Sequence, residues 1–150
     1  MRKLILLLSY IFIILLGYGN TPKVQPSSEA KSAFTAKFPG ATKFKWSIEK
    51  PGEYEVEFRL NGIKTAALFD LRGALIEIEE EIKEVNLPQS VKTSIIKDFS
   101  GYKLKEIEKV TNPNGDITYE MEALRRKIKL EIAFDFEGAI ISKESLKQEK

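Results

Sequence analysis

The stretch FDLRGALIE, Phe69–Glu77, decides how this chain folds, because nearly the same residues return 65 positions later as FDFEGAIIS, Phe134–Ser142. In each copy a phenylalanine ends a row of alternating apolar residues, and an aspartate and a glycine follow it. An aspartate side chain can accept hydrogen bonds from backbone N–H groups a few residues on, and glycine takes a positive φ without steric cost. The motif therefore predicts a corner between two antiparallel strands, and the chain should contain that corner twice.

Other parts of the chain repeat with nearly the same spacing. EYEVEF, Glu53–Phe58, aligns with TYEMEA, Thr118–Ala123, again 65 residues later, whereas KFPG, Lys37–Gly40, resembles DFSG, Asp98–Gly101, at an offset of 61. The difference of four residues falls in a loop, where insertions are tolerated. The sequence therefore predicts two copies of a unit of about 60 residues.

Each unit is expected to begin with a helix and to continue as strands. Apolar residues at helical spacing are Ala30, Phe34 and Phe38 in the first unit, and Val91, Ile95 and Phe99 in the second. Period-two alternation follows in stretches such as YEVEFRL and IKLEIAF. We therefore predict an α+β fold of two tandem repeats, residues 29–84 and 85–150, each a helix packed on a roughly four-stranded antiparallel sheet. A shared sheet or shared edges would bury more surface and protect exposed strand edges.

The N-terminus, MRKLILLLSYIFIILLGYGN, has the pattern of an export signal. Arg2 and Lys3 precede an apolar run over residues 4–16, and Gly17 and Gly19 occupy the positions of a cleavage site. The run is shorter than the roughly 20 residues that span a bilayer as a helix. We predict a signal peptide over residues 1–19, a flexible tether over 20–28 and a periplasmic or extracellular protein; an uncleaved anchor is the alternative.

Composition excludes several classes of function. The chain has no cysteine and no histidine, which removes disulfides, thiolate nucleophiles, zinc–histidine sites and serine–histidine catalysis. Arg2 and Lys3 account for both excess positive charges, so residues 20–150 are net neutral, which argues against nucleic acid as a partner. We predict no catalytic residue, no cofactor, no metal site and no membrane span after signal cleavage. The expected state is a monomer whose partner is an unidentified exported protein.

Strand alternation assigns a candidate protein-binding face on the side of the sheet away from the helices. Its members are charged residues at alternating positions: Lys45, Glu55, Glu57, Arg59, Glu120, Glu122, Lys129 and Glu131. A mixed-charge docking surface is one interpretation, and a solvated face with cross-strand ion pairs is the other. The pairs Glu55/Glu57 and Glu120/Glu122 could suggest glycoside chemistry, but on an open strand we expect nothing to raise their pKa values.

Three further stretches carry predictions. The acidic run IEIEEEIKE, residues 76–84, is predicted to be a solvated strand end leading into a linker, with a site for a cation or a basic partner as the alternative. Trp46, the only tryptophan, is predicted to face the helix. Residues 125–127, Arg-Arg-Lys, are predicted to form a hairpin tip.

Residues 28–142 resemble the PepSY-like, β-lactamase-inhibitor-like exported proteins of Bacteroidota. The resemblance lies in four stretches: AFTAKFPGATKFKW, YEVEF, FDLRGALIEIEEEI and LPQSVKTSI. The resemblance implies a curved antiparallel sheet with helices on one side, an extracytoplasmic location and binding rather than catalysis. It implies an inhibitor-like module that docks on another secreted or periplasmic protein through its open sheet face. The alternative is a small-ligand carrier with a pocket between sheet and helices, lined by Trp46, Phe58 and Phe69.

Overall fold

A computed structural model describes residues 25–147 of the chain. The elements in order are α1 (Ser28–Lys37), β1 (Thr42–Lys50), β2 (Glu53–Leu60), β3 (Ile63–Asp70), β4 (Leu75–Glu81), a 3₁₀ turn η1 (Glu84–Asn86), α2 (Gln89–Asp98), β5 (Lys103–Thr111), β6 (Ile117–Arg125), β7 (Ile128–Asp135) and β8 (Ile140–Lys147). The predicted signal peptide and most of the predicted tether lie outside the described residues.

All eight strands form one antiparallel sheet in the order β1 to β8, so the prediction of two tandem repeats, each with its own sheet, is wrong. The joint is the pairing of β4 with β5, which runs from Ile78 opposite Thr111 to Glu81 opposite Glu108. Two separate four-stranded sheets would leave β4 and β5 as open edges with unpaired backbone groups. Pairing these two strands satisfies both edges, and it makes one sheet in which the two short helices are a minor part.

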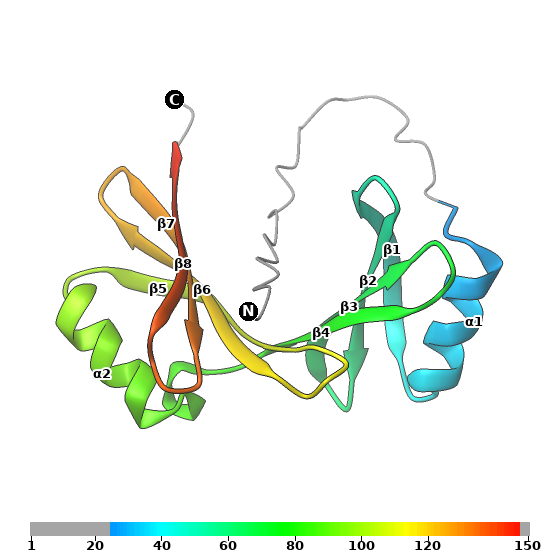
Figure 1. The fold of residues 1–150 in the computed structure, drawn as a ribbon, viewed down its shortest axis with the longest axis horizontal. Coiled ribbons are helices and arrows are strands. Elements are labelled where there is room, and N and C mark those ends of the chain that lie inside the picture. The colour runs from blue at the N-terminus through cyan, green and yellow to red at the C-terminus, as the bar shows by residue number, and fades with distance from the viewer. Residues whose placement is uncertain (1–24, 148–150) are drawn as a thin grey trace, which may run out of the picture.

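The two helices lie toward opposite ends of the bent sheet, on its outer side (Figure 1). Beneath α1, the ring of Phe34 lies 5.6 Å from that of Trp46 and 5.1 Å from that of Phe58. Beneath α2, Phe99 lies 6.0 Å from Phe134. The apolar side chains therefore form two clusters, one under each helix, and the prediction that Trp46 faces the helix is confirmed.

The two FD-x-x-G corners form as the sequence predicts. Oδ1 of Asp70 accepts hydrogen bonds from the backbone N–H groups of Arg72 and Ala74, both at 2.8 Å. Oδ1 of Asp135 accepts one from the N–H group of Ala139 at 2.8 Å. Each aspartate thus closes the turn between two paired strands, β3 and β4 in one case and β7 and β8 in the other.

The glycine of each corner has a second role, which is to let the corner touch a helix. Gly73 and Gly138 have φ values of 81° and 83°. A Cβ atom built on Gly73 would lie 2.6 Å from the carbonyl oxygen of Glu29, and one on Gly138 would lie 2.6 Å from that of Ser90. The hydroxyl of Ser94 also donates to the carbonyl oxygen of Gly138 at 2.6 Å. The corners therefore press directly on the first turns of α1 and α2 and fix both helices on the sheet.

Candidate protein-binding face

Glutamates dominate the sheet face opposite the helices. Glu55 and Glu77 both lie opposite Leu68 on β3, and paired residues in neighbouring strands point to the same side of a sheet. The residues that alternate with these glutamates along each strand point to the other side of the sheet. Val56, for example, belongs to the apolar cluster beneath α1. We call this surface the glutamate face, and its members are Glu55, Glu57, Glu77, Glu79, Glu106, Glu108, Glu120, Glu122 and Glu131.

The glutamate face is continuous across the joint between β4 and β5. Glu81 of β4 lies opposite Glu108 of β5, and Glu108 lies opposite Glu120 of β6. Farther along, Glu122 of β6 lies opposite Glu131 of β7. Carboxylates from both ends of the chain therefore belong to one surface, on the side of the bend away from both helices (Figure 1).

Part of this face is buried although neither helix covers it. The exposed fractions of Glu77 and Glu122 are 3% and 4%, and the apolar side chains of Leu68 and Val110 on the same face are also buried. A sheet that bends toward one side crowds the side chains on that side, and the bend seen in Figure 1 has this sense. Parts of the glutamate face are therefore a packed layer of carboxyl groups and apolar side chains, whereas others, such as Glu57, remain accessible to solvent.

Burial changes the acid–base properties of these carboxyl groups. It raises the pKa of Glu79 to about 9, with the carboxylates of Glu108, Glu77, Glu55 and Glu120 adding to the effect. Burial likewise raises the pKa of Glu77 and of Glu108 to about 7. At neutral pH the centre of the face consequently holds protons that exposed glutamates would have released.

The same direction holds farther out on the face. The pKa values of Glu55, Glu106 and Glu131 are raised, in each case mainly by burial. Lys64 opposes the increase at Glu55, and Lys129 opposes it at Glu131. The lysines of the face therefore reduce the increase in these pKa values but do not cancel it.

Hydrogen bonds and ion pairs satisfy some of these carboxylates but not all. The hydroxyl of Ser47 donates to Glu55 at 2.9 Å, and Lys129 forms an ion pair with Glu122. Oε2 of Glu77 and Oε1 of Glu131 are shielded from solvent and accept no hydrogen bond from the described residues. These two oxygens are therefore hydrogen-bond acceptors to which no described residue donates.

The structure brings the residues of the predicted binding face together, and their binding role stays a prediction. Lys45 lies opposite Glu57, and Lys129 pairs with Glu122 on the same face. Arg59 lies at the end of β2, where its guanidinium group donates to the carbonyl oxygen of Gly62 at 2.9 Å. The remaining predicted members are glutamates that the strand register places on this face: Glu55, Glu120 and Glu131.

Two expectations about these glutamates are wrong. Glu55 was expected to lie open to water with nothing to raise its pKa, but burial raises it, and Glu122 is almost completely buried. The acidic run over residues 76–84 was expected to be solvated, but Glu77 is 3% exposed and Glu79 is strongly desolvated. In both cases the reason is the bend of the sheet, which encloses side chains that lie on an uncovered face.

Sequence reasoning also missed members of the face on β4 and β5. Glu77 and Glu79 alternate with isoleucines in IEIE, and Glu106 and Glu108 flank Ile107 in EIE. This period of two is the same signal that placed Glu55 and Glu57 on the face. It could have located the missed carboxylates of β4, whereas in β5 a bulge between Lys105 and Glu108 interrupts it. It contains no information about burial.

The ion pair between Lys129 and Glu122 is expected to stabilise the fold, because Glu122 is buried. We predict that Lys129→Gln lowers the free energy of unfolding by about 1–2 kcal/mol, since a buried carboxylate loses its charged partner. The matched control is Arg72→Gln, whose side chain is 90% exposed and lies 3.4 Å from its partner Asp70, so the loss should stay below about 0.5 kcal/mol. Chemical denaturation of both variants measures the difference, and equal losses would show that the Glu122 pair has no special weight.

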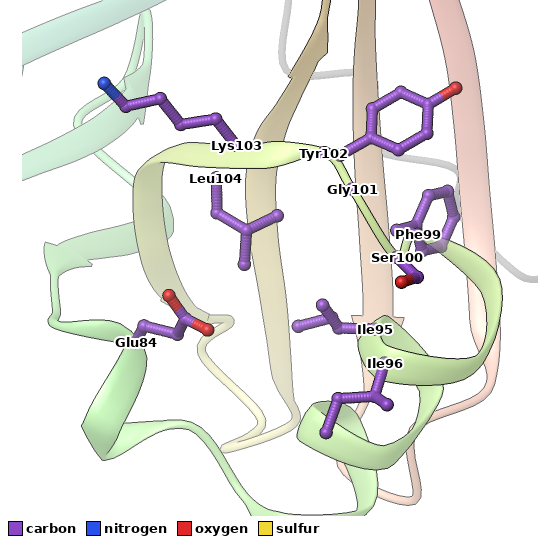
Figure 2. A pocket seen from close by; sticks show the side chains of 9 residues that line it. All are labelled: Glu84, Ile95, Ile96, Phe99, Ser100, Gly101, Tyr102, Lys103 and Leu104. Atoms are coloured by element: carbon purple, nitrogen blue, oxygen red, sulfur yellow. The ribbon is translucent and has the colours of Figure 1, made fainter.

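The site expected for a small-ligand carrier is filled by side chains. Trp46, Phe58 and Phe69 pack against one another and against Phe34, with the rings of Trp46 and Phe69 6.1 Å apart. A depression of about 470 Å³ lies elsewhere, between α2 and the start of β5, and it is open to solvent. Figure 2 shows its lining, which includes Ile96 from α2 and Leu104 from β5.

Two features are absent from residues 25–147 of the chain. Within that range, no group of three or more acidic, cysteine or histidine side chains is arranged to hold a metal ion. None of the helices described there is both long and apolar enough to cross a membrane.

Comparison with known proteins shows a fold and no family. No family model matches the chain, and no curated protein sequence matches it. Among solved structures, a protein of Bacteroides eggerthii described as a candidate periplasmic protein has a TM-score of 0.76 and 16% identity, over 83% of this chain and 91% of that one. A DUF2874 family protein of Bacteroides uniformis has a TM-score of 0.74 and 20% identity, over 81% and 90%.

A BLIP-like protein of Bacteroides fragilis, where BLIP stands for β-lactamase inhibitory protein, is also similar. Its TM-score is 0.69 at 18% identity, over 85% of this chain and 91% of that one. Identities this low establish the fold alone. The chain therefore has the fold shared by the BLIP-like and DUF2874 proteins of Bacteroides.

Proposed function

We propose that this chain is an exported, non-enzymatic binding protein that docks on another secreted or periplasmic protein through the glutamate face. The observation that carries the proposal is the burial of Glu77, whose Oε2 accepts no hydrogen bond from the described residues. An unpaired buried carboxyl group costs stability, and proteins keep such costly features mainly where function requires them. A partner that places positive charge over the face would offset part of this cost by electrostatic attraction.

The solved structures support the same class of function. One neighbour is described as BLIP-like and another as a candidate periplasmic protein, which fits an inhibitor-like module outside the cytoplasm. The apolar N-terminal run fits export of the chain. The proposed location is the periplasm or the cell exterior after removal of residues 1–19.

A pull-down from the native envelope fraction tests the proposal, with the chain from Asn20 onward as bait and mass spectrometry as the readout. The test variant is the double substitution Glu57→Lys, Glu144→Lys. Glu57 is 45% exposed on β2, and Glu144 is an exposed residue of β8 that lies opposite Glu131 and so on the same face. The control variant is Asp98→Lys, Glu137→Lys, at exposed positions outside the glutamate face.

We expect one exported protein to be retained by the wild type and by the control and to be lost by the test variant. Calorimetry with the purified partner would then confirm direct binding. Retention by all three baits, or by none while each is folded, would contradict docking through this face.

A further inference from the structure

We infer that the segment of the partner that seats on the glutamate face is cationic, a stretch of polypeptide whose lysine or arginine side chains are attracted by the surplus of carboxyl groups on that face. This inference rests on the proposed docking function and names the chemistry of the partner. It goes beyond the mixed-charge surface that the sequence alone suggests, because the structure adds acidic residues from β4 and β5 to the face.

The first observation is that the face holds acceptors without donors. Glu77 is 3% exposed, and its side chain lies on the glutamate face because it pairs with Leu68, as Glu55 does. Its Oε2, and Oε1 of Glu131 farther along the face, accept no hydrogen bond from the described residues. Ammonium and guanidinium groups are donors only, and their hydrogen bonds to carboxylates are the strongest available to a polypeptide.

The second observation is the imbalance of charge around these acceptors. Besides burial, the carboxylates of Glu120 on β6, Glu53 on β2 and Glu49 on β1 raise the pKa of Glu77, and Lys50 is the one cation among its main electrostatic neighbours. Lys50 already forms an ion pair with Glu53 at 3.2 Å. The chain therefore supplies fewer positive charges than the face can accept.

The centre of the face is similar. Glu79 has only acidic main neighbours, which are Glu108 of β5, Glu77 of its own strand, Glu55 of β2 and Glu120 of β6.

Glu108, opposite Glu120, has Lys64 of β3 as its one cationic main neighbour. Glu106, next to it on β5, has Lys64 and Lys129. These two lysines show the interaction that we infer for the partner, because an ammonium group near the carboxyl groups favours their charged forms.

Binding of a cationic segment is expected to release protons from the glutamate face and therefore to depend on pH. A cationic segment favours ionised carboxylates, so binding must release the protons that burial retains on Glu77 and Glu108, whose pKa values are about 7. Lysine side chains keep their charge over this range. Affinity should therefore increase with pH, by roughly tenfold or more between about pH 6 and pH 8.

Fluorescence anisotropy with a fluorescein-labelled decalysine peptide tests this chemistry on the chain from Asn20 onward. We expect binding that weakens with added salt and that strengthens from about pH 6 to pH 8. The double variant Glu77→Gln, Glu131→Gln should bind about tenfold more weakly, because a neutral amide removes negative charge that attracts the peptide. The control Glu137→Gln, at an exposed turn position, should bind as the wild type does.

The outcomes separate this inference from the proposed function. Decalysine binding that is absent, or that the control weakens as much as the double variant, overturns the inference. Full displacement of the peptide by millimolar Ca²⁺ also overturns it, because the face would then be a site for small cations. If the envelope pull-down yields a partner whose binding the Glu77→Gln, Glu131→Gln variant leaves unchanged, the docking function stands and the cationic segment does not.

Discussion

The free energy of unfolding is expected to fall by at least about 3 kcal/mol between pH 5 and pH 8, because the folded chain keeps protons that the unfolded chain releases. Glu77, Glu79 and Glu108 have pKa values of about 7, 9 and 7 in the fold, against 4.5 for an ordinary glutamate. A group whose pKa is raised by folding stabilises fully below its unfolded value and loses that contribution as the pH rises toward its folded value. One carboxyl group with a folded pKa of about 7 accounts for about 3 kcal/mol at about 1.4 kcal/mol per pH unit.

The opposite effect belongs to a lower range of pH. The pKa values of Asp70 and Glu29 are lowered, mainly by backbone hydrogen bonds that favour the charged carboxylates. A lowered pKa contributes stability above the unfolded value that is lost only as the pH falls through the folded one. These two groups therefore do not contribute to the change in the free energy of unfolding between pH 5 and pH 8, which comes from the glutamate face.

Glu79→Gln identifies the source of the slope. The amide cannot ionise, so the variant should be more stable than the wild type at pH 8 and should show a shallower slope. Glu137→Gln, at an exposed turn position, should leave the slope unchanged. Urea denaturation at several pH values measures both variants, and a wild-type stability that is flat or rising between pH 5 and pH 8 would contradict the burial of these carboxyl groups.

Gly73→Ala and Gly138→Ala are each expected to lower the free energy of unfolding by at least about 3 kcal/mol. The φ values of 81° and 83° cost an L-residue about 1–2 kcal/mol. The added methyl group would also lie 2.6 Å from a helix carbonyl oxygen, on Glu29 in one case and on Ser90 in the other. Backbone cannot move aside as a flexible side chain can, so the helix must shift on the sheet.

Gly62→Ala separates the two costs. Gly62 has a similar φ of 85°, but nothing lies within 4 Å of a Cβ atom placed there. Only the conformational cost of about 1–2 kcal/mol should remain. If all three alanine variants lose the same stability in chemical denaturation, the corners do not fix the helices as the structure indicates.

The sequence predicts the local elements well because their signals are local. The helical spacing of Phe34 and Phe38 predicts α1 from neighbouring residues alone. The aspartate and glycine of each corner likewise determine a turn of only a few residues. The joint between β4 and β5 depends instead on which strand edges meet in the folded chain. A bulge between Lys105 and Glu108, where Glu106 has a φ of 47°, also breaks the alternation that would have revealed β5.

The candidate site divides in the same way. Alternation assigns Glu55, Glu120 and Glu131 to one face, and the register agrees. Burial of that face depends on the bend of the sheet and on the joint, which brings Glu79 of β4 close to Glu108 of β5. The alternation of apolar and polar residues along a strand indicates neither the bend nor the joint. The raised pKa values could therefore not be predicted from it.

A carboxyl-detected NMR titration of the free protein, with ¹³C-labelled glutamate, tests the central claim most directly. Resonances would be assigned with Glu77→Gln, Glu79→Gln and Glu108→Gln variants. We predict that these three carboxyl groups titrate at pH values near or above 7. If all glutamates titrate below about pH 5.5, the face is solvated and the account of a desolvated docking surface is wrong.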